Sequence, residues 1–395
     1  LYGLLRSMNK WPERSAKVRI FNPEIKSHGW ENKFTVLAIL CRDLPFSTDS
    51  VRGELNRRNI RIHTIASCNL VSERAADGEL IAIHNPENDA VEGHSKESLL
   101  FFEMGRHAEP EQLQELRDTL TAILGEVESV VDDFSEMRAR VDDSIETVSS
   151  CEGVDDELRS EAVEFLRWLG SNRIVFLGYE YLSVEWNGQD CEASVDKTAS
   201  LGLLRQRDTA GAYDLIADID HCSAEELRQK QLSFSKSRIR SRVHRLAYPD
   251  YIEIKAYDSQ GNVIGQHRFL GLYTSSVYTM SPKLIPIVRR KTAQVVQMSK
   301  LENTEHGGRE LTRVLELFPR EELFQSSIAN LFDTVTAVNQ IQERRQTRLF
   351  VRKDAHGKFF SCLVYIPRDT YTTELRIDIQ NILSVALGAE ESEFT

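Results

Sequence analysis

The side chains best suited to chemistry in this sequence are the cations of one short basic row. At every second position from 236 to 244 stands a residue that can carry positive charge: Lys236, Arg238, Arg240, Arg242 and His244. In an extended strand, residues two apart project from the same side, so the row would present one cationic face. Such a face is most often a solvated exterior, but a guanidinium can also bind a carboxylate through two hydrogen bonds. The row is therefore a candidate effector site or subunit contact.

The motifs of common enzyme classes are missing from the sequence. A dinucleotide-binding turn needs closely spaced glycines so that backbone amides can reach the pyrophosphate, yet no GxG occurs among the 20 glycines. GxxxxGK[ST], HExxH and GxSxG are also absent. The ten histidines include no H-x₃₋₅-H pair and the six cysteines no CxxC pair, which argues against a zinc site. The sequence thus assigns no catalytic, cofactor-binding or metal-ligating residue.

Length and composition indicate a multidomain protein of the reducing cytoplasm. The 395 residues exceed one compact core and indicate about two to four domains. The cysteines are scattered, which argues against a disulfide scaffold and for the cytoplasm. No apolar run approaches the ~20 residues needed to span a bilayer. The chain begins with leucine rather than methionine, as expected for part of a longer protein.

The net charge of −12 is unevenly distributed along the chain. Residues 87–164 contain 23 acidic and 6 basic side chains, whereas residues 236–300 contain 12 basic and 3 acidic ones. Oppositely charged regions can complement one another in an oligomer, and they can equally be ordinary surface. The overall acidity and the few aromatic residues within the basic row disfavour a nucleic-acid partner.

Antiparallel strands are the elements expected to position the basic row. Apolar residues recur at every second position on both sides of a polar turn at 258–261: Ile252, Ile254, Ala256, Ile264, Leu270 and Leu272. This period is typical of half-buried strands. The basic row itself would belong to a preceding strand over residues 239–246.

The first third of the chain predicts the order strand, helix, strands, helix. Strands are expected at 17–21, 34–41, 60–71, 79–83 and 98–104, with a helix ending near 58 and another beginning near 111. The first helix follows a proline turn with Ser/Thr/Asp capping residues, and Asp77-Gly78 is a strong hairpin signal. This order is that of a ferredoxin-like sandwich.

The remainder of the chain alternates between helical and mixed patterns. An acidic helical hairpin is expected over 127–170, then a strand at 173–186, a loop-rich region to 235 and a short helix from Ser223. Further helices are expected at 282–299, 309–318 and 327–340. A hairpin at 349–352 and 359–366 then precedes a final helix, in which Leu375, Ile379 and Leu383 have helical spacing.

Seven runs along the chain resemble the large bacterial NAD-specific glutamate dehydrogenases. They are KVRIFNP (17–23), LPFSTDSVRGELNRR (44–58), FLRWLGSNRIVFLGYEY (165–181), SRVHR (241–245), DSQGNVIGQHRFLGLYTSS (258–276), FPREELFQ (318–325) and RLFVRKDAHGKFFSCLVYIPRDTYTTELR (348–376). Together they cover nearly the whole chain. They resemble the long N-terminal regulatory region of that family, not its dehydrogenase core.

The resemblance implies an α+β, multidomain protein in which ferredoxin-like ACT modules and a PAS-like antiparallel-sheet module are joined by helical segments. The implied domains are an ACT-like domain at 1–126, a helical hairpin spacer at 127–170, a PAS-like sensor domain at 171–281, a helical linker at 282–343 and a truncated second ACT-like domain at 344–395.

The resemblance also implies a second, weaker candidate site. ACT domains commonly bind amino acids at the loop between the first strand and the first helix, which offers Asp43, Pro45 and Asp49 here. The glycine that usually follows the proline is Phe46 in this chain, which removes a place for a ligand to approach the backbone. The alternative is an ordinary helix-capping turn.

The function implied by the resemblance is regulation and oligomerisation of an NAD-dependent glutamate dehydrogenase. The full-length cytoplasmic enzyme would convert L-glutamate, water and NAD⁺ to 2-oxoglutarate, ammonium and NADH, with NAD bound outside this segment. The implied partners are its own catalytic domain, identical subunits and an amino-acid or carboxylate effector, with no membrane. The alternative is a stand-alone ligand-sensing or scaffolding protein without enzymatic activity.

Overall fold

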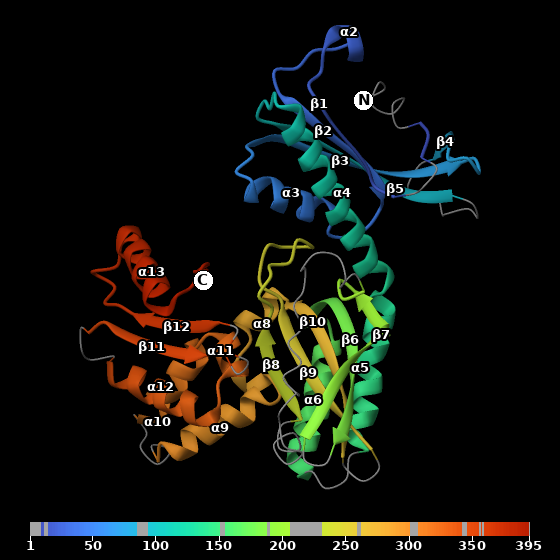
Figure 1. The fold of residues 1–395 in the computed structure, drawn as a ribbon. Helices are drawn as coiled ribbons and strands as arrows, with labels where there is room; N and C mark the ends of the chain where they lie inside the picture. The colour runs from blue at the N-terminus through green and yellow to red at the C-terminus, as the bar shows by residue number, and fades with distance from the viewer. Residues whose placement is uncertain are drawn as a thin grey trace.

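Two antiparallel sheets, a separate hairpin and intervening helices make up the computed structural model (Figure 1). It describes residues 9–11, 15–84, 94–150, 155–187, 190–205, 231–258, 262–300, 307–341, 346–354, 357 and 359–394. The predicted mixed, multidomain α+β class is confirmed. None of the helices within these ranges is both long and apolar enough to cross a membrane.

The first sheet has five strands in the order β1-β2-β5-β3-β4. Its strands are β1 Lys17–Phe21, β2 Thr35–Arg42, β3 Ile62–Arg74, β4 Leu80–His84 and β5 His94–Met104, and its helices are α2 Ile25–His28, α3 Ser47–Arg57 and α4 Pro110–Asp132. One face packs against α3 and α4 through a core that includes Leu37, Leu55 and Leu120. The expected ferredoxin-like order is confirmed, although β5 begins earlier than the sequence predicted, at His94 rather than Ser98.

The helix α4 connects the first sheet to the rest of the molecule (Figure 1). It continues without interruption through residues 126 and 127 to Asp132, so the expected domain boundary falls inside one helix. After Asp133 the chain continues into α5 Phe134–Ser149 and α6 Asp156–Gly170. Together with later helices, they cover one face of the second sheet, α5 through Met137 and Val141 and α6 through Phe165 and Leu166.

The second sheet has the order β7-β6-β10-β9-β8. Its strands are β6 Ile174–Asn187, β7 Asp190–Gly202, β8 Leu232–Lys236, β9 Asp250–Tyr257 and β10 Val263–Tyr273. β7 is a correction, because the sequence predicted loop there. The strand DCEASVDKTASLG alternates only weakly, because its apolar positions are mostly small residues and Lys197 interrupts them. Its pairing with β6 completes the strand. The short helix expected from Ser223 lies outside the described residues.

The central strands are more enclosed than their alternating pattern predicted. Every residue of β9 is buried, whereas Ile264 in β10 is 45% exposed instead of facing the core. The expectation of half-buried strands is therefore wrong, because both faces of the sheet are covered. Ile252 and Phe269 pack in the core that faces α5 and α6, while Tyr251 and Leu270 belong to a second core on the other face.

The expected strand over 239–246 does not exist. Residues 237–249 form bends instead, and the backbone N–H of Ser241 donates to the carbonyl of Ala247 at 2.9 Å. His244 has a φ of 69°, a left-handed conformation that no strand residue adopts. The basic row therefore does not project from one face.

Helices and a hairpin complete the C-terminal part. They are α8 Ser275–Thr279, the 3₁₀ turn η1 Pro282–Leu284, α9 Val288–Met298, α10 Gly307–Leu317, α11 Arg320–Gln325, α12 Ile328–Ile341, β11 Arg348–Lys353, β12 Phe360–Tyr365 and α13 Thr373–Leu387. The hairpin packs on the helices through Phe350 and Leu363, and Arg352 pairs with Glu322 at 2.7 Å. No residue of α13 is fully buried against the described parts of the chain.

Candidate regulatory junction between the two sheets

The two candidate sites, far apart in sequence, meet in space between the first and second sheets. The backbone N–H of His244 donates to Oγ of Ser50 at 3.0 Å, which connects the basic segment to α3. The rings of Phe46 and His244 lie 4.7 Å apart between centroids. We call the group formed by Phe46, Ser50, Glu126, Arg242 and His244 the junction.

Backbone conformation places both aromatic rings of the junction. Phe46 stands immediately before α3 with a φ of 71°, and His244 has a φ of 69°. The left-handed region costs a side-chain-bearing residue about 1–2 kcal/mol, so tertiary contacts must hold both residues there. Phe46 packs against the core of the second sheet, a cluster that includes Val243 and Leu270. It occupies, in the glycine-like conformation, the position that the resemblance assigns to an ACT glycine.

An ion pair connects α4 to the basic segment. The guanidinium of Arg242 donates to the carboxylate of Glu126, whose side chain is only 8% exposed. Burial raises the pKa of the Glu126 carboxyl, and Arg242 only partly offsets that effect. Burial, followed by the charge of Arg245, lowers the pKa of His244. The junction therefore favours a neutral imidazole next to Phe46.

The other members of the basic row lie in different surroundings. Nζ of Lys236 is 3.2 Å from Asp250 and 3.0 Å from Glu321, at the end of β8. Although burial lowers the pKa of Lys236, the two carboxylates raise it above its ordinary value. Arg240 lies over the Tyr248 ring at 5.0 Å, and Arg238 is exposed. Among the contacts of the described residues, the members of the row that meet helices of the first sheet are Arg242, on α4, and His244, on α3.

The three residues predicted in the ACT-like loop face outward. Asp43, Pro45 and Asp49 are all exposed, and Asp49 pairs with Arg52 on α3 at 3.0 Å. Their neighbours Phe46 and Ser50 make the contact with the second sheet instead. Sequence reasoning recognised Phe46 only as a missing glycine, and it missed the side-chain role.

Sequence reasoning also missed a row of buried charges across the second sheet. Arg268 on β10 is 1% exposed, and its guanidinium lies 2.9 Å from Glu253 on β9 and 3.6 Å from Glu180 on β6. The strand registers place Arg268 directly opposite both glutamates. The detectable signal was the presence of charged residues inside largely apolar strands, since a buried charge requires a partner.

The acidic and basic regions of the sequence pair within the chain. Arg289 on α9 contacts Glu161 and Glu164 on α6, and Arg290 lies 3.4 Å from Glu157. Arg242 and Glu126 form a further such pair. The charge division predicted from composition therefore serves, at these positions, to hold α4 and α6 against the basic segment and α9.

The chemistry available at the junction is recognition and positioning. Its groups are a hydroxyl, an imidazole, an aromatic ring and one buried ion pair, joined by contacts that depend on the relative position of the two sheets. A change at the loop before α3 would alter the Phe46 and Ser50 contacts directly.

Three family models match the chain in order. The glutamate dehydrogenase ACT1 domain matches residues 1–120, the glutamate dehydrogenase helical motif 1 matches residues 285–344, and the glutamate dehydrogenase ACT2 domain matches residues 348–395. The first match includes the loop before α3, and the third includes the β11–β12 hairpin and α13.

Curated relatives carry the same description. The chain is 38% identical to the NAD-specific glutamate dehydrogenase of Halomonas elongata over 100% of its own length, and 40% identical to that of Pseudomonas aeruginosa over 98%. The corresponding Mycobacterium tuberculosis protein is 30% identical over 88% of the chain. These matches span only 25%, 24% and 20% of the respective relatives.

Proposed function

The chain belongs to the family of NAD-specific glutamate dehydrogenases, to whose N-terminal part it is homologous, and on that premise we propose that it regulates and assembles such an enzyme. The observation that carries this proposal is the succession of two ACT-domain matches with a helical motif between them. The full-length enzyme would oxidise L-glutamate with NAD⁺ and water to 2-oxoglutarate, ammonium and NADH, in the cytoplasm.

The module boundaries belong to this proposal. An ACT-like module at 1–126, a spacer at 127–170, a PAS-like module at 171–281, a linker at 282–343 and a second ACT-like module at 344–395 account for the two sheets and the hairpin. The PAS-like assignment is supported by the second sheet, with the order β7-β6-β10-β9-β8 and helices on one face. The catalytic domain would follow as a further partner, with NAD bound there.

Regulation would pass through the junction. Phe46 fills, with its own ring, the place near the loop backbone that a glycine would leave open. The loop before α3 then acts as a contact surface, and an amino-acid or carboxylate effector would act by changing its contacts with His244 and Arg242. The candidate side chains of this loop that face solvent are Asp43, Pro45 and Asp49, and Arg238 of the basic row is exposed elsewhere.

Contact between identical subunits is supported by the first sheet. Residues 63–69 of β3 are exposed. Among the described residues, this stretch pairs with β5 on one side only, because β4 pairs with β3 only from Val71 onward. An open strand edge is suited to pairing with a second chain.

Enzyme assays distinguish this function from that of a stand-alone sensor. The purified 395-residue chain is expected to form no NADH from glutamate and NAD⁺, whereas the full-length protein from the same gene is expected to do so. Reproducible turnover by the 395-residue chain, after removal of contaminating enzyme, would contradict the assignment of catalysis to a domain outside this chain. Lack of turnover by a folded full-length protein would favour the sensor.

A further inference from the structure

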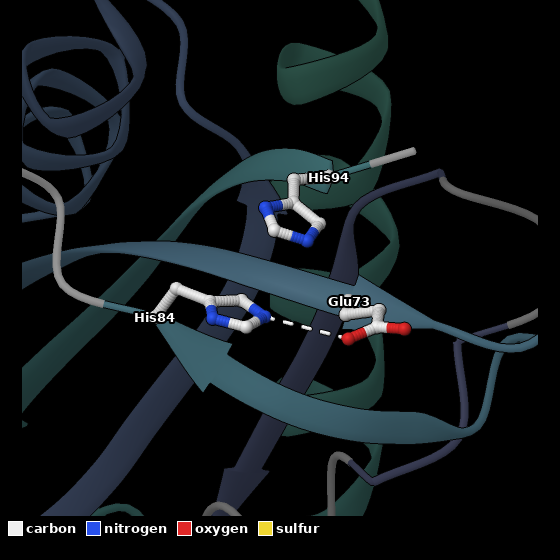
Figure 2. Close-up of side chains that lie close together, drawn as sticks. All are labelled: Glu73, His84 and His94. Carbon is white, nitrogen blue, oxygen red and sulfur yellow. Dashed lines mark ion pairs between the residues drawn. The ribbon is translucent and has the colours of Figure 1, made fainter. Parts of the chain in front are cut away.

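A group of two histidines and one glutamate lies at the end of the first sheet where β3, β4 and β5 meet. Glu73 is on β3, His84 is the last residue of β4 and His94 is the first residue of β5 (Figure 2). Within the part of the chain that the structure describes, these three are the one set of His, Cys, Asp or Glu side chains close enough to share a metal ion.

Strand register explains why three residues distant in sequence converge. Glu73 is paired directly with His94 across the β3–β5 ladder, and His84 is paired with Val71 across the β3–β4 ladder. Residues 71 and 73 project from the same side of β3, and paired residues share a face. All three side chains therefore project from one face of the sheet.

The distances among the three side chains suit a small divalent ion. Nε2 of His84 lies 3.4 Å from Oε2 of Glu73, and the ligand atoms of all three residues lie within 4.8 Å of one another. Two ligands bound at about 2.0–2.1 Å to a tetrahedral ion are roughly 3.4 Å apart. The first pair already has that spacing.

One polar atom of the site lacks a hydrogen bond within the described parts of the chain. Nε2 of His84 is shielded from solvent yet makes no hydrogen bond with the described residues. The two imidazoles are stacked, with centroids 4.2 Å apart and an angle of 13° between the rings. Because a metal lies in the plane of each ring that binds it, one ring must rotate on binding. All three side chains are only partly buried, which leaves room for that rotation.

We propose that Glu73, His84 and His94 bind one transition-metal dication of the Zn²⁺ class. Two imidazoles and a carboxylate are ligands that Zn²⁺ favours, and three protein ligands leave a fourth position for water. The ion would clamp the ends of β3, β4 and β5, and binding would stabilise the folded first sheet by mass action. This inference is independent of the enzymatic assignment, because the site lies wholly within this chain.

Short-motif searching could not find this group. His84 and His94 are ten positions apart, which is longer than the H-x₃₋₅-H spacing of helical or finger-type sites. Glu73 comes from a third strand. Only the pairing of β3 with both neighbours brings the three together.

Titration of the metal-free 395-residue chain with Zn²⁺ tests the proposal. Isothermal calorimetry should detect a site of about one equivalent that His84→Gln and His94→Gln each weaken by roughly tenfold or more. The matched control is His63→Gln, since His63 is an exposed histidine of the same strand β3 that stacks on Phe34 at 4.0 Å. The control should bind Zn²⁺ like the wild type.

A second readout guards against a folding defect. Thermal unfolding in EDTA should be the same for wild type and variants, and added Zn²⁺ should raise the midpoint of wild type and of His63→Gln only. If either histidine variant fails to fold in EDTA, the Glu73→Gln variant takes its place in the comparison with the wild type. The titration uses protein at about 10 µM. The proposal is overturned if the wild type binds no Zn²⁺ when the ion is added at about 100 times that concentration, or if the wild type and all variants bind Zn²⁺ with equal affinity.

Discussion

At the scale of single residues, the burial of Glu126 determines how much stability is lost when its partner Arg242 is substituted. Glu126 is 8% exposed, whereas Arg242 remains 36% exposed. Arg242→Glu should lower the free energy of unfolding by about 2–3 kcal/mol, less than for a fully buried pair, because it leaves Glu126 next to a like charge. Chemical denaturation measures this loss.

The reversed pair is the matched control for that prediction. Adding Glu126→Arg to Arg242→Glu should recover part of the lost stability, while Glu126→Arg alone should be destabilising. If the double variant is no more stable than the worse single variant, the two side chains do not interact in solution.

At Phe46, a glycine variant is expected to be more stable than an alanine variant, which is the reverse of the usual order. Phe46→Ala removes the ring from the second-sheet core and keeps a side chain at a φ of 71°. Phe46→Gly removes the same ring and also relieves the left-handed strain. The glycine variant should therefore be more stable than the alanine variant by roughly 1 kcal/mol, and it should unfold at a higher denaturant concentration. Greater stability of the alanine variant would contradict the assigned backbone conformation.

At the scale of secondary-structure elements, two glycines predict opposite effects of the same substitution. A Cβ added to Gly125 in α4 would meet no atom within 4 Å, whereas at Gly271 in β10 it would lie 2.7 Å from the carbonyl oxygen of Val175. Gly125→Ala should stabilise the chain by about 0.5–1 kcal/mol through helix propensity. Gly271→Ala should destabilise it by about 1–3 kcal/mol. Thermal unfolding of both variants, made in parallel, checks the signs.

The elements that the sequence predicted well are those whose local signals agree with their packing. The Asp77-Gly78 turn, with a φ of 83° at Gly78, and the spacing of Val51 and Leu55 in α3 are legible without tertiary context. β7 is less legible, because its alternating apolar residues are mostly small and Lys197 interrupts them, so the ladder to β6 is needed to define the strand. The alternation of cations over 236–244 was misleading, since His244 leaves the extended region.

The candidate site was predictable in part. Both segments that form the junction were identified, the first from a family resemblance and the second from its cations. Their meeting was not predictable, because most strands of the two sheets lie between Phe46 and His244 in the sequence. The ion pair between Arg242 and Glu126 likewise depends on where α4 ends relative to the second sheet.

At the scale of the whole molecule, buried titratable groups predict the response to acid. Burial lowers the pKa of His267 to about 4, below the ordinary value of about 6.5. Between these two pH values, the imidazole of His267 is protonated in the unfolded chain but remains neutral in the folded chain. The contribution of His267 to the free energy of unfolding is therefore fully present above about pH 6.5 and is lost as the pH falls toward 4. The full effect is on the order of 3 kcal/mol.

Comparison with His267→Gln isolates this effect. Burial raises the pKa of Asp250 to about 6, so this carboxyl acts in the opposite direction over the same pH range. The variant retains Asp250 and should lose stability less steeply than wild type between pH 6.5 and 4. Parallel slopes of unfolding midpoint against pH would contradict a buried, neutral His267.

The continuity of α4 has a mechanical consequence. Its 23 residues make a rod about 35 Å long, anchored in the first sheet by Leu116 and Leu120 and near the second by Val127 and Val130. A stiff rod transmits rotation, so a tilt of about 5° at one end displaces the other by about 3 Å. That displacement is comparable to the length of the hydrogen bond between Ser50 and His244. Because Glu126 near the end of α4 contacts Arg242, such a tilt would act directly on the junction.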